Sequence, residues 1–135
     1  GLPIACVLVK DSVSKTIKSG EHATTFGGGP VVCSAALATL GIILEKGFLK
    51  SVKEKSGYLK SGLLKLPNIS EVLGAGFLLG VKLKKHLPDL VKKCLDKGII
   101  IGNSGEKNIF RLLPPITVSK KEIDLFLDKF NKILT

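Results

Sequence analysis

Apolar side chains alternate strictly along residues 77–83, where Phe77, Leu79, Val81 and Leu83 occupy every second position. Successive side chains of a strand point to opposite faces, so this spacing predicts a β-strand with one buried face. Such a strand is stable only in a sheet whose buried face is covered by other elements. We therefore expect further strands and helices around it.

The segments that follow contain signals for these elements. Residues 90–95 carry an apolar stripe at helical spacing, which predicts a helix that stops at Gly98. Short apolar runs at residues 99–101 and 109–113 predict two strands. Residues 119–122 have the Ser-x-x-Glu form of a capping box, which opens a final amphipathic helix. The order of strand, helix, strand, strand, helix predicts an α+β fold with helices over a sheet.

The N-terminal half has a different pattern. Residues 4–9 are continuously apolar, which predicts a strand buried on both faces. A short helix capped by Asp11 or Ser12 is expected to end near Gly20. Two longer helices are expected over residues 30–45 and, after a break at a glycine, to about residue 64.

A loop with two threonines and three consecutive glycines precedes the first longer helix. Thr24 and Thr25 offer hydroxyl donors, and the glycines Gly27, Gly28 and Gly29 allow backbone N–H groups to approach a ligand. The start of the following helix carries partial positive charge. Together these features suit a phosphate. A tight turn before a helix is the alternative, and the spacing alone leaves it open.

Arg111 is the only arginine of the chain and lies in the apolar strand expected over residues 109–113. A guanidinium group can hold a carboxylate through two parallel hydrogen bonds. A structural ion pair with a nearby acid would explain the same position. The sequence leaves both explanations open.

Charge and composition exclude several classes of protein. The net charge of +10 comes almost entirely from lysines, which are expected on solvated helix faces. Aromatic residues make up 5% of the chain and no nucleic-acid-binding motif occurs, which argues against specific binding of nucleic acid. No apolar run reaches the roughly 20 residues of a membrane span. A basic protein that binds nucleic acid or a membrane surface stays an alternative from a different class.

Cysteine and histidine usage favours neither disulfides nor a metal. Cys6, Cys33 and Cys94 are an odd number at wide spacing, so we expect three small buried side chains in a reducing cytoplasm. His22 and His86 lie far apart, which predicts no metal site.

Four segments become informative when they are taken together and in order. They read GLPIA at residues 1–5, GEHATTFGGGP at 20–30, LGAGFLLG at 73–80 and IFRLLPP at 109–115. These segments resemble those of class III pyridoxal-phosphate-dependent aminotransferases, in which the first follows the Schiff-base lysine and the third is the first strand of the small domain. The resemblance extends over essentially the whole chain.

The resemblance implies a fold and an activity. The fold would be the C-terminal portion of a fold type I pyridoxal-phosphate-dependent transferase. Residues 1–29 would be a remnant of the cofactor-binding large domain, 30–66 connecting helices, and 67–135 a small α+β domain with an antiparallel sheet. The intact cytoplasmic homodimer would transfer an amino group from N-acetylornithine to 2-oxoglutarate in arginine biosynthesis. Ornithine or another ω-amino acid is the alternative donor, and a phosphate-binding module is an alternative of another class.

Roles for single residues also follow from the resemblance. Thr25 would donate to the phosphate of pyridoxal phosphate bound in the neighbouring subunit, beside Gly27 and Gly28. Thr24 would lie near the substrate, and Arg111 would hold a substrate carboxylate. No metal ligand is implied.

Two departures from the family pattern qualify these roles. Gly29 stands where the family commonly has asparagine, so a side-chain hydrogen bond would be lost. The Schiff-base lysine would lie before Gly1, and Lys10 and Lys18 lie outside its motif. We therefore expect a chain that is inactive by itself and does not bind the cofactor alone. Apolar surface should be exposed, and the strand expected at residues 4–9 should lack a partner or pair with another copy.

Overall fold

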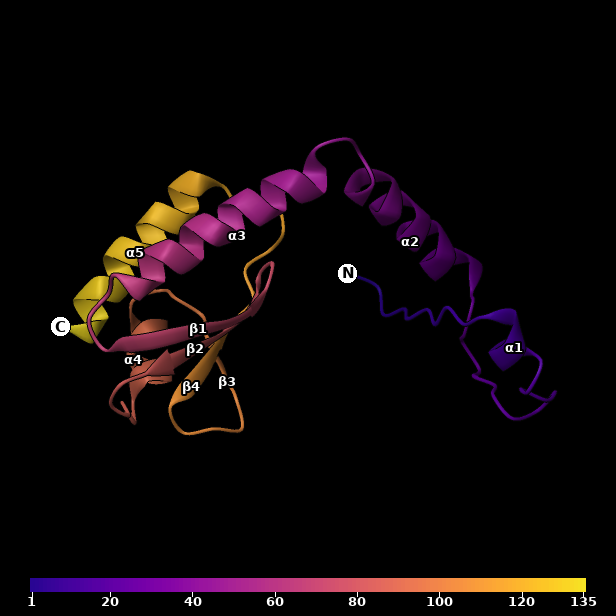
Figure 1. The fold of residues 1–135 in the computed structure, drawn as a ribbon, viewed down its shortest axis with the longest axis horizontal. Coiled ribbons are helices and arrows are strands. Elements are labelled where there is room, and N and C mark those ends of the chain that lie inside the picture. Colours follow the sequence, from indigo (N-terminus) through magenta and orange to yellow (C-terminus); the bar gives the residue numbers. More distant parts are fainter. The chain divides into compact units, whose positions relative to one another are not determined.

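The computed structural model describes all 135 residues, which form two compact units, Gly1–Phe48 and Leu49–Thr135. The C-terminal unit contains three helices and four strands, whose order can be followed in Figure 1. They are α3 (Phe48–Leu64), β1 (Ile69–Ala75), β2 (Leu78–Leu83), α4 (Leu90–Asp96), β3 (Gly102–Asn103), β4 (Ile109–Leu112) and α5 (Lys120–Leu134).

The four strands form one antiparallel sheet in the order β1-β2-β4-β3. The strands β1 and β2 are joined by a two-residue turn, Gly76–Phe77. Gly74 precedes this turn with φ of 97°, and a Cβ at this position would collide with the carbonyl oxygen of Leu78. The sheet and its helices confirm the predicted α+β fold class.

One face of the sheet and the helices enclose the hydrophobic core. On β2 the side chains of Leu79, Val81 and Leu83 are buried, as the alternation predicts. Figure 1 shows α3 and α5 side by side over the sheet. The helices contribute buried apolar side chains to this core: Leu59 and Leu63 from α3, Leu90 and Cys94 from α4, and Ile123 and Phe130 from α5.

Hydrogen bonds between distant segments hold α3 in place. Lys55 Nζ donates to the carbonyl oxygen of Val118 at 2.7 Å, and Lys60 Nζ donates to that of Gly74 at 2.6 Å. The Tyr58 hydroxyl donates to Asp124 of α5 at 2.5 Å. Each lysine thus donates to a backbone carbonyl distant in sequence, which helps to fix the helix above the sheet.

Two strand assignments from the sequence were inaccurate. The isoleucines at residues 99–101 form no strand, and β3 consists of the next two residues, Gly102 and Asn103, because these pair with Arg111 and Phe110 of β4. Residues 73–80, matched to a first strand, contain the turn between β1 and β2 instead. The strand β1 lacks clear alternation because its register shifts between Ile69 and Glu71.

The N-terminal unit contains the helices α1 (Asp11–Ser14) and α2 (Pro30–Ile43) and has no buried residue. Residues 4–9 lack a strand partner within the chain, as expected. The prediction of a strand there was nevertheless wrong, because a strand requires hydrogen-bonded neighbours. The helix α1 is shorter than expected. It begins after Lys10 without a side-chain cap, so neither Asp11 nor Ser12 caps it.

Exposed apolar side chains cover the N-terminal unit, as predicted. Leu8 is 93% exposed, Leu37 on α2 is 70% exposed, and Leu44 at the C-cap of this helix is 73% exposed. Apolar area of this extent is uncommon on the surface of a folded unit. No single helix is long and apolar enough to cross a membrane, although α2 and α3 meet the same length and composition criteria when taken as one bent pair.

The three cysteines differ in their surroundings. Cys94 is fully buried, and this burial raises the pKa of its thiol to about 11. Cys33 is half-buried and Cys6 is exposed. The prediction of three buried cysteines therefore holds only for Cys94, because the N-terminal unit has no core in which the other two could be enclosed.

We expect Phe130→Ala to destabilise the C-terminal unit by about 3–5 kcal/mol. Phe130 is 0% exposed, and its ring lies 5.3 Å from the rings of Phe110 and Phe126. Denaturant unfolding followed by the fluorescence of Tyr58, the only tyrosine, measures the loss. The control Leu125→Ala, at a position 56% exposed on the same helix, should change stability by about 0.5 kcal/mol or less. A loss below about 1 kcal/mol for Phe130→Ala would contradict the prediction.

The capping box of α5 should make stability depend on pH. The backbone N–H of Ser119 donates to the Glu122 carboxylate at 2.7 Å and holds the pKa of this group below its ordinary value of 4.5. A lowered folded-state pKa means that the stabilisation is present above the unfolded pKa and is lost as pH falls through the folded pKa. We expect Glu122→Gln to lose less stability than the wild type in urea titrations between about pH 7 and about pH 3. Identical pH profiles would contradict this.

Candidate functional site

The Thr/Gly loop, residues 20–29, leads directly into α2. Gly28 has φ of 70°, a conformation that side-chain-bearing residues rarely adopt. Gly29 is the N-cap of α2 and Pro30 its first residue. The side chains of Thr24 and Thr25 are exposed, and their hydroxyl groups make no hydrogen bond within the chain. Both hydroxyl groups are therefore available to a ligand.

The structure brings Thr24 and Gly27 together. The hydroxyl oxygen of Thr24 lies so close to the Cα of Gly27 that a Cβ at residue 27 would collide with it. Gly27 therefore has a steric role, in addition to the backbone role that the sequence predicts. Without a side chain at this position, the loop can fold the Thr24 hydroxyl against its own backbone.

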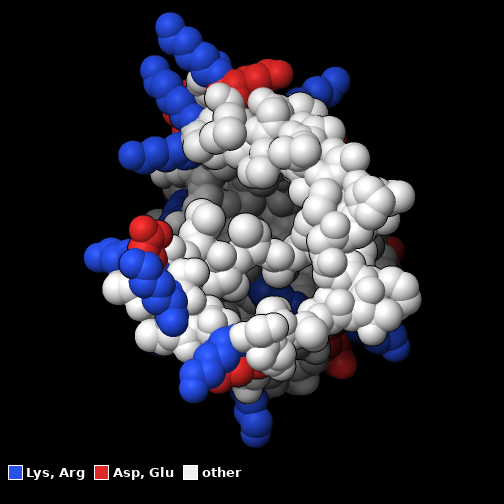
Figure 2. Space-filling model, turned by 90° about the vertical axis from the view of Figure 1, so that its right-hand side faces the viewer, with Lys and Arg blue, Asp and Glu red and all other residues white.

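A hollow of about 1250 Å³ lies within the N-terminal unit. Thr24, Gly27 and Gly28 line it, together with apolar side chains from residues 3–9. Figure 2 looks onto this unit and shows a hollow framed largely by uncharged side chains. Thr25 does not line the hollow, so its hydroxyl faces a different environment from that of Thr24.

The groups of this loop fit a phosphate. Two free hydroxyl donors and a loop of small residues are a suitable donor set for phosphate oxygens. The acid of the loop, Glu21, already accepts a hydrogen bond from the backbone N–H of Lys18 at 2.7 Å. Gly29, the N-cap of α2, has no side chain with which to cap the helix.

Arg111 lies on β4, on the face of the sheet opposite the core. Its neighbours Phe110 and Leu112 are buried, whereas the Arg111 side chain is exposed. Directly opposite it stand Gly80 on β2 and Gly102 on β3. Because both neighbours lack side chains, the surface beside the guanidinium group is open.

The cation of Arg111 forms no ion pair with an acid of this chain. The two ion pairs present join Lys50 to Glu54 at 3.9 Å and Lys82 to Glu71 at 4.0 Å. A structural ion pair, the alternative that the sequence left open, is therefore not formed. The guanidinium group is free to bind an anion from outside the chain.

The predicted site residues belong to both units of the structure. Thr24, Thr25, Gly27 and Gly28 lie in the N-terminal unit, and Arg111 lies in the C-terminal unit. Their assignment to one active site stays a prediction.

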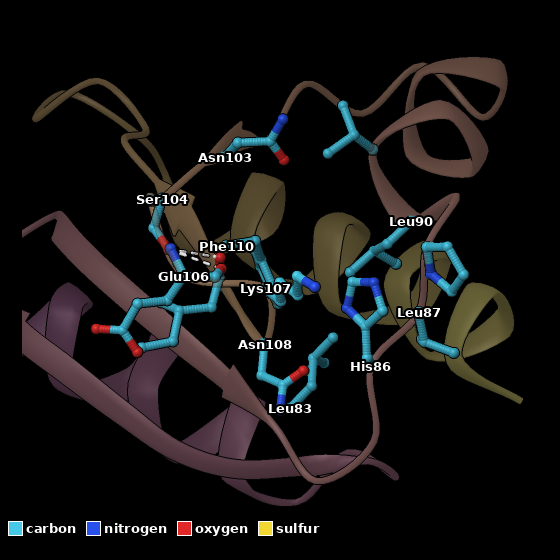
Figure 3. Close-up of a pocket in the computed structure, with 14 residues that line it drawn as sticks. Leu83, His86, Leu87, Leu90, Asn103, Ser104, Glu106, Lys107, Asn108 and Phe110 are labelled. Carbon is cyan, nitrogen blue, oxygen red and sulfur yellow. Dashed lines mark hydrogen bonds between the residues drawn. The ribbon is translucent and has the colours of Figure 1, made fainter.

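The sequence did not indicate a second, smaller pocket in the C-terminal unit. Its volume is about 220 Å³, and it lies between the loop after β2 and the loop from β3 to β4. Figure 3 shows His86 and Asn103 at opposite sides of this pocket, with Lys107 between them. Periodicity does not report on loops, so this pocket had no sequence signal. No group of three or more metal-ligating side chains occurs here or elsewhere in the chain.

Comparisons with known proteins identify the family. The family model described as aminotransferase class III matches residues 1–134. An acetylornithine aminotransferase of Alnus glutinosa is 41% identical over 128 residues, and a probable acetylornithine aminotransferase of Dictyostelium discoideum is 44% identical over 133 residues. These matches cover 92% and 94% of the chain. The chain belongs to the class III aminotransferases.

The fold agrees with this assignment. The crystal structure of acetylornithine aminotransferase from Elizabethkingia anophelis matches 94% of the chain with a TM-score of 0.78 at 24% identity. The chain covers 34% of that structure, and 28% and 29% of the Alnus and Dictyostelium proteins. It thus spans about a third of the length of the proteins it matches.

We expect Gly27→Ala to displace the Thr24 hydroxyl, because the new methyl group would occupy its position. Amide chemical shifts of Thr24 and Thr25 should change, as measured by NMR. Gly41→Ala in α2 is the matched control, since a Cβ there meets no atom within 4 Å. It should leave the loop signals unchanged and stabilise the helix by about 0.5–1 kcal/mol. Unaltered loop shifts in Gly27→Ala would refute the close packing of Thr24.

Proposed function

We propose that this chain supplies the substrate-carboxylate arginine and a cofactor-phosphate loop to an aminotransferase. The enzyme would transfer an amino group from N-acetylornithine to 2-oxoglutarate, with ornithine or another ω-amino acid as the alternative donor. The names of the similar proteins from Alnus and Dictyostelium support acetylornithine as the donor. Both proposed substrates carry carboxylates, and a site that binds them needs a cationic side chain.

The observation that carries this proposal is the environment of Arg111. The only arginine of the chain stands on an open sheet face between two glycines, without an acid as its partner. A buried strand backbone fixes its Cα, because Phe110 and Leu112 anchor β4 in the core. The backbone of Arg111 is thus held in place, and its guanidinium group is free to form two parallel hydrogen bonds with a carboxylate.

The Thr/Gly loop would hold the phosphate of pyridoxal phosphate. Thr25 would donate its hydroxyl to a phosphate bound in the neighbouring subunit of a homodimer, with Gly27 and Gly28 shaping the loop. Thr24, which lines the hollow, would lie near the substrate. When bound, pyridoxal phosphate supplies an electron sink for the carbon that exchanges its amino group.

The wider organisation belongs to the same proposal. Residues 1–29 would belong to the cofactor-binding domain, residues 67–135 would form the small domain, and the helices of residues 30–66 would connect the two. Because no lysine of the chain matches the Schiff-base position, we propose that the 135-residue chain is inactive alone and does not retain the cofactor. Three free cysteines support a reducing compartment, for which we propose the cytoplasm.

Titration of the 135-residue chain with 2-oxoglutarate tests the role of Arg111. Because Arg111 is the only arginine, its Nε–Hε signal in a ¹⁵N-labelled sample is identified by composition alone. We expect a saturable shift of this signal. Arg111→Lys replaces the fork by a point charge, and we expect at least about tenfold weaker binding, followed through backbone amides of β4.

The matched control is Lys82→Met, which removes a cation from β2 next to the same sheet face. Binding to this variant should change by about twofold or less, because a general charge effect is screened by salt. Loss of affinity in Lys82→Met without a loss in Arg111→Lys, which keeps the positive charge, would show that 2-oxoglutarate responds only to net charge. That result would contradict the proposed carboxylate site.

A further inference from the structure

The smaller pocket of the C-terminal unit is a preformed space with apolar walls. It lies between the loop after β2 and the loop from β3 to β4, and its volume is about 220 Å³. Leu83, Leu90 and Phe110 belong to its lining, and each is at most 4% exposed, so the hydrophobic core holds these walls in place. The space suits a ligand smaller than a drug-sized molecule.

Hydrogen bonds fix both loops that border this pocket. The Ser104 hydroxyl donates to the carbonyl oxygen of Ile109 at 2.7 Å and accepts from the backbone N–H of Glu106 at 3.2 Å. On the other loop, the Asn68 side chain accepts from the backbone N–H of Lys85 at 2.7 Å and donates to its carbonyl oxygen at 3.0 Å. The two loops are therefore held by groups other than the polar side chains that border the space between them.

Several of these bordering side chains have no partner within the chain. His86, Asn103 and Lys107 form neither a side-chain hydrogen bond nor an ion pair. Figure 3 shows Lys107 extending toward His86, whereas the carboxylate of Glu106, the one acid of the lining, points away from both. An ammonium group, an imidazole N–H and an amide N–H are suitable donors for an anion. The pocket thus combines apolar walls with donors that no group of the chain uses.

We propose that this pocket binds a small carboxylate with a compact aliphatic body. The carboxylate accepts hydrogen bonds from the three free donors. The aliphatic body packs against Leu87 and Val91, two half-buried side chains of the lining, because their apolar area is still open to water. Arg111 and the Thr/Gly loop do not line this pocket, so the inference does not depend on the function proposed above.

Isovalerate and two ligands that each lack one of its parts form the test. Acetate keeps the carboxylate without the branched body, and 3-methylbutan-1-ol keeps the body without the charge. The full 135-residue chain has two histidines, so in proton NMR His22 serves as an internal control for His86, and His86→Gln assigns the signals. We expect a saturable shift of the His86 ring signals with isovalerate and unmoved His22 signals. Each control ligand should bind at least about fivefold more weakly.

Lys107→Met and Lys121→Met form a matched pair of variants. Both remove one exposed lysine charge, but Lys121 lies on α5 and does not line the pocket. We expect at least about fivefold weaker binding of isovalerate to Lys107→Met and a change within about twofold for Lys121→Met. Unfolding curves show whether each variant is folded, and the comparison of the three ligands needs only the wild type.

The proposal is overturned if isovalerate causes no saturable shift of His86, or if either control ligand binds as tightly as isovalerate. It is also overturned if the two lysine variants bind isovalerate equally well, because the effect would then be one of net charge or would not involve Lys107 at all.

Discussion

Burial of the alternating side chains of β2 is the interaction on which the C-terminal unit depends. Leu79, Val81 and Leu83 lie in the middle of the sheet and contact the core formed with α3 and α5. Burial of aliphatic side chains of this size contributes about 1.5–3 kcal/mol each. This covered face fixes the strand order, and through β4 it also fixes the backbone of Arg111.

The opposite face of the same sheet has a different physical character. Successive side chains of a strand point to opposite faces, so the neighbours of the buried β4 residues lie on the outer face. Arg111 is such a neighbour, and glycines on β2 and β3 leave its surroundings open. A rigid covered face thus supports an uncovered face that presents a cation. This combination suits a binding site, because burial of the core stabilises the sheet without using the cation, which stays free to bind a ligand.

The N-terminal unit shows what happens when a similar apolar content lacks a covered face. Its side chains come from an extended segment, a loop and α2, and none of them is buried. A strand cannot form at residues 4–9 without neighbouring strands, whatever the β-propensity of its residues. The Thr/Gly loop nevertheless has a specific conformation that depends on its own residues. Gly27 leaves room for the Thr24 hydroxyl, and Gly28 adopts a positive φ.

The sequence by itself determined the elements whose signals are local. Alternation at Phe77–Leu83, the capping box at Ser119 and Glu122, and the helix that ends at Leu64 all follow from periodicity and hydrogen bonding within a few residues. The tertiary structure decided what depends on partners. Residues 4–9 form no strand because no strand lies beside them, and Gly102 gained its place beside Arg111 only through pairing of β3 with β4. Pairing joins residues far apart in sequence, so no local pattern can report it.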